Sequence, residues 1–275
     1  MEISQEVPNA NLRVLSLGAG VQSTVLALLA ARGEIGPMPD AAIFADTQWE
    51  PKAVYEHLDW LEKQLPFPVH RVTAGNIRNG IIASAHSSGD RFASVPWYIV
   101  DGIGKRQCTS EYKIEPIHRE VRRLLGYKKH AKVERGTMVE QWIGISTDEL
   151  PRMKDSRVKW VKHRWPLIEL RWNRTQCQLW FAREYPGRHL PKSACLGCPF
   201  HNDRYWVDLK SNSPDEWDDA VEVDASLRRN GPLRGMKAEQ FMHRSCIPLG
   251  DVDFTMLENQ TEFGFMEECE GMCGV

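Results

Sequence analysis

Two cysteines three positions apart stand in the segment 193–201, which reads SACLGCPFH. A C-x-x-C pair is typical of half a zinc site, half an iron–sulfur site or a redox pair. A tetrahedral site needs two further ligands beyond Cys195 and Cys198. We expect Cys108 to supply one of them. The fourth position is open between Cys246, Cys177, His201 and a substrate or sulfide, and we take Cys246 as the first candidate.

Cys108 itself stands in a cationic stretch, RQCTSEYK, with Arg106 and Lys113 close by in sequence. Positive neighbours favour the thiolate, which is the form that binds a metal or attacks sulfur. A small buried hydrophobic residue is the alternative for a single cysteine. The polar context favours chemistry, so Arg106 and Lys113 are candidate catalytic residues.

A glycine-rich stretch, SLGAGVQST, joins an apolar run to an amphipathic one. Such a strand-to-helix turn presents backbone N–H groups and a helix dipole to an anion. Its spacing fits neither the Rossmann nor the Walker pattern, so a phosphate loop and a tight structural turn both stay open. The candidate phosphate-binding residues are Ser16, Gly18, Ala19, Gly20, Gln22, Ser23 and Thr24.

Asp46 and Thr47 follow a second apolar run, in FADTQWEP. In an open α/β sheet, ligands bind at the carboxyl ends of the strands, so this pair is expected in the same crevice as the glycine-rich turn. Helix capping by Thr47 or Glu50 is the alternative.

The last cysteines stand in the terminal EECEGMCGV. A tail thiol can enter a site, attack and leave again to be reduced. Cys269 and Cys273 are therefore candidate nucleophiles. Incidental tail cysteines, or a pair that completes a zinc site, are the alternatives.

Charge is uneven along the 275 residues, although the formal net charge is only −2. Residues 151–192 form a basic island with 11 Lys and Arg against 3 Asp and Glu. Four tryptophans lie among these cations, which suits a phosphate-bearing partner, nucleotide or nucleic acid. A solvated face and a core role for the tryptophans are the alternatives. No signal peptide and no long apolar run is visible, so we expect a cytoplasmic protein with reduced cysteines and no membrane partner.

Strand-like runs at 12–17, 41–47 and 67–74 alternate with helical patterns after residue 20 and at 51–64. This βαβαβ order predicts a parallel sheet with helices on its faces. A further strand is expected at 140–146 and a long loop at 86–106. The remaining helices are expected within 110–126, after Pro116, and at 173–184 and 214–229.

Taken in order, these segments resemble the adenine nucleotide alpha hydrolase (PP-loop) superfamily, in particular its adenylyl-sulfate and phosphoadenylyl-sulfate (PAPS) reductase group. LSLGAGVQST resembles the group's modified PP-loop. FADTQWEPKAVYEHLDWL, CTSEYKIEPIHREV and CLGCPF resemble its later motifs. The form SACLGCPFHNDRYW also resembles phage-encoded and bacterial reductase-domain proteins. The resemblance implies a mostly parallel five-stranded α/β sheet flanked by helices over residues 10–212. We expect a helical and irregular extension with a cysteine-containing tail over 213–275.

Three departures from the family pattern bear on the chemistry. Gln22 stands where ATP-cleaving members carry an acid, which favours the reductase branch. Cys108-Thr109 stands where cluster-bearing reductases have adjacent cysteines, so the resemblance supplies only three ligands: Cys108, Cys195 and Cys198. The tail order differs as well, so the choice between Cys269 and Cys273 is open.

The leading hypothesis is an enzyme that binds an adenine nucleotide (ATP, adenylyl sulfate or PAPS) beside a [4Fe–4S] cluster and reduces a sulfonucleotide. Residues 16–23 would hold phosphate, and Arg106, Lys113 or the basic island the sulfate end. A tail thiol would attack sulfur, and a thioredoxin-like partner would release sulfite. One alternative is an ATP-dependent sulfurtransferase that thiolates DNA or RNA, supplied by a cysteine desulfurase. Another is a zinc-containing nucleic-acid-binding protein without catalysis; a homodimer is open in each case.

Overall fold

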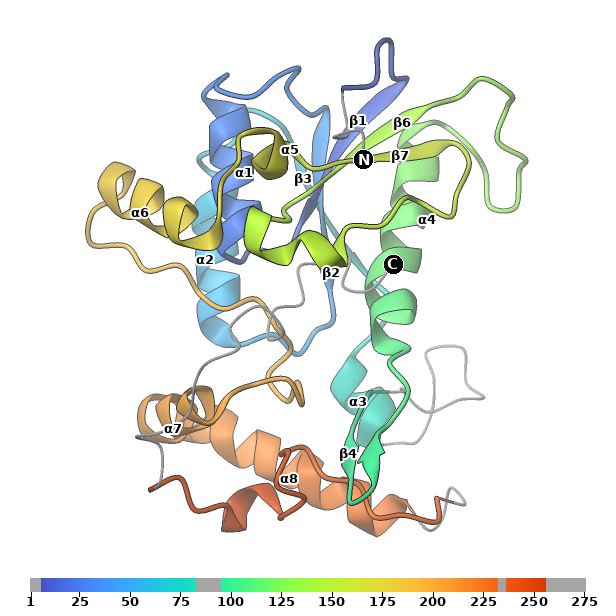
Figure 1. Cartoon of the computed structure of the whole chain (residues 1–275). Helices are drawn as coiled ribbons and strands as arrows, with labels where there is room; N and C mark the ends of the chain where they lie inside the picture. Colours follow the sequence, from blue (N-terminus) through green and yellow to red (C-terminus); the bar gives the residue numbers. More distant parts are fainter. Residues whose placement is uncertain (1–5, 83–94, 232–235, 256–275) are drawn as a thin grey trace.

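A five-stranded sheet forms the centre of the protein (Figure 1). The structure, a computed structural model, describes residues 6–82, 95–231 and 236–255. The strand order is β3-β2-β1-β6-β7, and every neighbouring pair is parallel. The strands are β1 (Leu12–Leu17), β2 (Ala41–Asp46), β3 (Val69–Thr73), β6 (Val139–Ile143) and β7 (Val161–Arg164). The predicted fold class, a parallel α/β sheet with helices on its faces, is confirmed.

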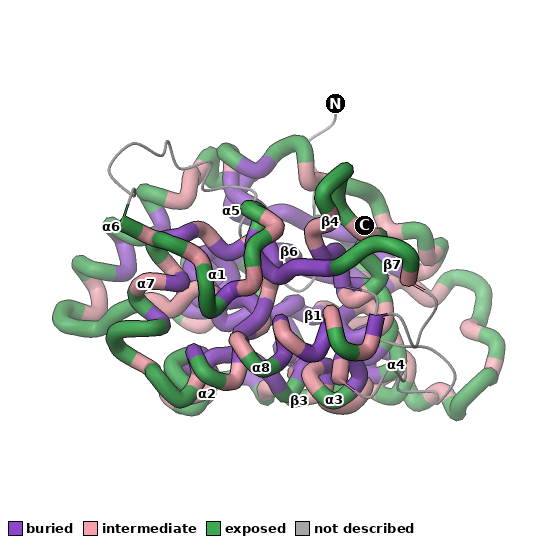
Figure 2. The backbone as a smooth tube through the Cα atoms, turned by 90° about the horizontal axis from the view of Figure 1, so that it is seen from below, coloured by how far each residue is buried: buried purple, intermediate pink, exposed green. Residues whose placement is uncertain are grey.

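Helices cover both faces of this sheet because neighbouring residues of a buried strand point to opposite sides. Leu15 packs with α1 (Val21–Ala31), α2 (Lys52–Glu62) and α6 (Arg174–Glu184). The neighbouring Val14 instead packs on the other face, where α4 (Glu115–Leu124) contributes Ile117 and Val121. Figure 2 shows the buried strands enclosed between these layers.

Besides the helices on the two faces of the sheet, a further group of helices, called here the third helical body, lies beyond the carboxyl ends of the strands (Figure 1). It contains α3 (Ile77–Ile82), α7 (Asp203–Asn212) and α8 (Pro214–Asn230), which share an aromatic cluster with Trp49 after β2. Trp206 of α7 and Trp217 of α8 pack at 6.4 Å between ring centroids. The two helices therefore pack on each other across the domain boundary expected at residue 212.

Smaller elements complete the connections. A hairpin of β4 (Tyr98–Ile99) and β5 (Gly102–Ile103) occupies part of the segment expected to be a loop. The helix expected near 110–126 begins as a π-turn, η1 (Ser110–Ile114), and continues as α4. Short helical turns occur at η2 (Thr147–Arg152), α5 (Pro166–Glu169) and η4 (Leu249–Asp251). No helix in the described part of the chain is both long and apolar enough to cross a bilayer.

Candidate functional site

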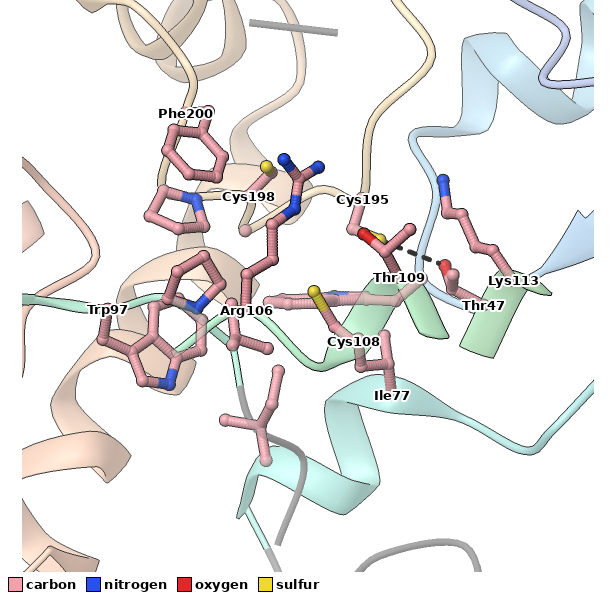
Figure 3. A pocket seen from close by; sticks show the side chains of 16 residues that line it. Thr47, Ile77, Trp97, Arg106, Cys108, Thr109, Lys113, Cys195, Cys198 and Phe200 are labelled. Atoms are coloured by element: carbon pink, nitrogen blue, oxygen red, sulfur yellow. Dashed lines mark hydrogen bonds between the residues drawn. The ribbon is translucent and has the colours of Figure 1, made fainter. Parts of the chain in front are cut away.

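A pocket of about 470 Å³, measured with its open mouth, lies between the carboxyl edge of the sheet and the third helical body (Figure 3). Cys108, Cys195 and Cys198 all line it, although Cys108 and Cys195 are 87 positions apart in sequence. Arg106 and Lys113 line the same space. The structure thus brings together the three thiols and two cations that the sequence singled out.

The other walls of the pocket are mainly apolar. They include the side chains of Trp49, Ile77, Ile81, Trp97 and Phe200. The guanidinium of Arg106 lies 5.1 Å from the centre of the Phe200 ring, so the Arg106 segment and the cysteine segment meet across the pocket. An apolar pocket with a few converging polar groups is the usual form of a small-molecule site.

Cys195 is placed by the loop that follows β2. The backbone N–H of Leu196 donates to the carbonyl of Trp49 at 2.7 Å. The Cys195 thiol then lies 3.4 Å from the Thr47 hydroxyl and 3.7 Å from a Glu50 carboxylate oxygen. Thr47 donates to the same Glu50 oxygen at 3.0 Å. Thr47 therefore lies in the pocket and does not cap α2.

Glu50 also pairs with Lys113, at 3.7 Å between the lysine Nζ and the carboxylate Oε1. Both side chains are almost fully buried, 1% exposed for Glu50 and 6% for Lys113. A buried charge pair keeps its geometry because breaking it would leave one charge without compensation. Sequence reasoning weighed Glu50 only as a helix cap; no sequence signal places it beside a thiol.

Asp46 does not line the pocket. Its carboxylate accepts from the Gln48 N–H at 2.7 Å and from the Tyr55 hydroxyl at 2.8 Å. These bonds shape the turn after β2. Burial raises the pKa of Tyr55 well above its ordinary value, and the hydrogen bond to Asp46 adds to that shift.

The C-x-x-C segment is a tight turn supported by His201. The Cys198 N–H donates to the Cys195 carbonyl at 2.9 Å, and His201 Nε2 lies 2.9 Å from the same carbonyl. Burial lowers the pKa of His201 to about 3, so the ring is neutral and its Nε2–H is the donor. His201 stacks on Tyr205 at 3.4 Å between centroids. It supports the turn from behind.

Cys108 and Thr109 enter the pocket just before the π-turn. Burial raises the pKa of the neighbouring Tyr112, and Glu111, Cys108 and Cys195 contribute further to that rise. Both thiols therefore lie near one phenol. Thr109 is 4% exposed, and its buried hydroxyl has no hydrogen-bond partner among the described residues. A buried hydroxyl without a protein partner is unusual, and an ordered water, an ion or a ligand would complete its hydrogen bonding.

The remaining cysteines lie elsewhere. Cys177 is fully buried in the core on α6, and Cys246 is not among the residues that line the pocket. Cys269 and Cys273 lie outside the described residues. Within the described ranges, no three His, Cys, Asp or Glu side chains gather closely enough to hold a single metal ion.

The glycine-rich turn lies next to the cysteine segment but is closed in this structure. Ser16, Gly18, Ala19, Gly20, Gln22, Ser23 and Thr24 are all buried. The Ser23 hydroxyl accepts from the Gly18 N–H at 3.2 Å, and the Ser193 hydroxyl donates to the Gly18 carbonyl. Thr24 bonds to His57 at 3.0 Å. The turn thus contacts the chain two residues before Cys195, and its hydroxyls bind protein partners.

Gln22 does not present its side chain to an anion. Its amide nitrogen donates to Ser146 at 3.2 Å and to Glu149 at 3.0 Å, and its oxygen accepts from Arg174 at 3.1 Å. Gln22 therefore ties α1 to the segment after β6 and to the start of α6. Arg174 is a member of the basic island that reaches the carboxyl edge. In contrast, the island's residues 154–160 precede β7 and so lie at the amino edge.

The comparisons with known proteins find similarity among solved structures. No family model and no curated protein matches the chain. Among solved structures, the chain is similar to a phosphoadenylyl-sulfate (PAPS) reductase from Candida auris, solved as a phosphate complex. The similarity has 13% sequence identity and a TM-score of 0.38, and it covers 68% of this chain and 76% of that chain.

Proposed function

We propose that the protein is an enzyme of sulfur chemistry that acts on an adenine nucleotide, most closely a thiol-dependent sulfonucleotide reductase. One observation carries the proposal: Cys108, Cys195 and Cys198 line one pocket together with Arg106 and Lys113. That pocket lies at the carboxyl edge of a parallel sheet, where ligands of such folds bind.

The two cations suit the anionic end of a sulfonucleotide. Arg106 and Lys113 would hold the sulfate, and the apolar wall would exclude water from it. A thiolate from the tail, Cys269 or Cys273, would attack the sulfate sulfur. The sulfur–oxygen bond to the nucleotide would break and the nucleoside phosphate would leave with that electron pair. The resulting S-sulfonate would be reduced by the dithiol of a thioredoxin-like partner, which becomes a disulfide as sulfite leaves.

The donor set of the pocket fits an iron–sulfur cluster in its chemistry. Cys108, Cys195 and Cys198 would be three thiolate ligands, and the buried Thr109 hydroxyl, which lies next to Cys108, would be an oxygen donor for the fourth position. Lys113 and Arg106 would offset the negative charge of the thiolates. When bound, a [4Fe–4S] cluster would supply a structural crosslink between the two cysteine-containing segments. Zinc on the same thiols is the alternative, and it would require the three cysteines to move closer together than the described residues place them.

The hydrogen bonds of the Gln22 side chain favour the reductase over an ATP-cleaving enzyme. Its carboxamide is occupied by Ser146, Glu149 and Arg174, and it brings no carboxylate to a magnesium pyrophosphate. An ATP-dependent sulfurtransferase that thiolates DNA or RNA, supplied by a cysteine desulfurase, is the second candidate. Exposed cations remote from the pocket, described below, favour it.

The test is anaerobic purification followed by iron, sulfide and zinc analysis of matched variants. Cys195→Ser and Cys198→Ser should lose iron and visible colour, whereas Cys177→Ala removes a thiol outside the pocket and should keep both. Thr109→Cys supplies a fourth thiol and should make the colour more resistant to oxygen. Full colour in Cys195→Ser would remove the cluster assignment.

Activity assays on the same samples separate the two candidates. A reductase releases sulfite from adenylyl sulfate or PAPS when a dithiol is present. A sulfurtransferase releases pyrophosphate from ATP only when nucleic acid is added. Pyrophosphate release without sulfite release would replace the first candidate with the second.

A further inference from the structure

The amino edge of the sheet, opposite the thiol pocket, carries a concentrated positive charge. Two segments meet there: residues 119–135, with 7 Lys and Arg against 2 acids, and residues 152–162, with 5 against 1. They lead into β6 and β7, which pair from Val139 opposite Val161. The Val139 N–H donates to the Trp160 carbonyl at 2.8 Å. The two segments are therefore neighbours in space (Figure 1).

Both segments contact α4, which brings their charges to one surface. The Arg122 guanidinium donates to the carbonyls of Ala131 and Lys128. The His118 ring on α4 lies 6.2 Å from the Trp160 ring. Arg119 and Arg123 are exposed one turn apart on α4. Arg123 pairs with Glu120 at 2.7 Å, so Arg119 is the one that adds positive charge along the helix.

The loop cations are exposed and uncompensated. In the first segment they are Lys128, Lys129, Lys132 and Arg135. In the second they are Lys154, Arg157, Lys159 and Lys162. Among the described residues, none of these eight side chains takes part in an ion pair. Eight such charges on one surface concentrate anions from solution and favour a partner that carries many negative charges in a row.

Two half-buried aromatic rings lie between these cations: Tyr127 at the start of the first loop and Trp160 at the end of the second. Cations that follow a phosphate backbone, combined with aromatic rings, are the means by which proteins hold single-stranded nucleic acid. We infer that this amino-edge surface is a docking surface for single-stranded nucleic acid. The inference is independent of the thiol chemistry, because the surface shares no residue with the pocket.

The test measures binding of a short fluorescent single-stranded oligonucleotide to the full chain at several salt concentrations. The loop variant carries Lys128→Gln, Lys129→Gln and Lys132→Gln. The control variant makes the same charge change at exposed lysines elsewhere, with Lys52→Gln, Lys63→Gln and Lys237→Gln. A second variant of the surface carries Lys154→Gln, Lys159→Gln and Lys162→Gln.

Loss of three phosphate contacts should lower the slope of log affinity against log salt by about 2, at roughly 0.7 per contact. Between roughly 50 and 200 mM salt, the wild type should then lose about twentyfold more affinity than the loop variant. The second variant should show the same decrease and the control none. Equal slopes in the wild type and loop variant would overturn the inference, as would an equal decrease in the control. Binding to anionic vesicles, polyglutamate or duplex DNA alone would also overturn it.

Discussion

The turn between Cys195 and Cys198 depends on the absence of a side chain at Gly197. A Cβ placed there would lie 2.2 Å from Cη2 of Trp49 and 2.8 Å from Cε of Met242. The end of a methionine can give way, but Trp49 cannot easily move. Its indole N–H donates to Asp219 at 2.7 Å, and its carbonyl accepts from Leu196 within the turn itself. Gly197→Ala must therefore displace the cysteines from the loop after β2.

Overpacking of this kind costs about 1–3 kcal/mol. For a chain of this size, each kcal/mol lowers the melting temperature by roughly 2–4 °C. We therefore expect Gly197→Ala to melt roughly 2–12 °C lower. The proposed cluster further predicts less iron per chain in this variant. Gly250→Ala is the matched control, because its Cβ would meet Val221 at an ordinary 3.4 Å. It should change the free energy of unfolding by less than about 0.5 kcal/mol.

A double-mutant cycle isolates the contact. Trp49→Phe removes the ring atoms that the added methyl group at position 197 would contact, and it also removes the hydrogen bond from the indole to Asp219. The double variant should therefore be more stable than the two single effects predict by at least about 1 kcal/mol. Urea unfolding followed by circular dichroism gives the four free energies. Additive effects, or a Gly197→Ala variant as stable as the wild type, would refute the reasoning.

Three further outcomes follow from the packing of the site. Gly144→Ala would place a Cβ 2.9 Å from the first turn of α1; titration should show weaker adenine nucleotide binding, and unchanged affinity would relocate the nucleotide site. Ser193→Ala removes the bond to Gly18 and should cost about 1 kcal/mol in urea unfolding; no loss would mean that this bond does not stabilise the fold. Burial lowers the pKa of His57 and of His118 to about 4, so both stay neutral in the fold while the unfolded chain takes up protons below about pH 6.5. The free energy of unfolding should therefore fall as the pH drops from roughly 6 to 5, and each of these histidines should contribute about 1.2 kcal/mol per pH unit to that slope. His57→Gln should lower the slope by about that amount, and an unaltered slope would contradict the assignment.

Four strands of the sheet were predictable because apolar residues recur through their segments, as in LRVLSL for β1 and AAIFAD for β2. The fifth, β7, was not, because its sequence is VKHR. Arg164 is tolerated inside because it pairs with Glu140 at 3.4 Å and with Glu169 at 2.8 Å. Those partners stand on β6 and α5, and only the tertiary structure brings them to the strand. A buried charge that is paired this way leaves no signal in the local pattern.

The candidate site, like the sheet, was predictable only in part. Residue type and resemblance singled out Cys108, Cys195 and Cys198, and the fold brings them to one pocket. From the sequence, Glu50 is only a candidate helix cap, and Thr109 is only a departure from a family motif. Their roles depend on which loops face each other across the pocket. The tail thiols of the proposed reaction stay predictions.

The cysteine turn and the glycine-rich turn are mechanically connected. Ser193 bonds to Gly18 two residues before Cys195, and Leu196 bonds to Trp49 one residue after it. The glycine-rich turn is buried, so an adenine nucleotide can reach its N–H groups only if the covering segment moves. That movement pulls on the backbone that positions Cys195. Nucleotide entry and thiol position are then parts of one displacement, so under the proposed function the thiols would be arranged only after the nucleotide has bound.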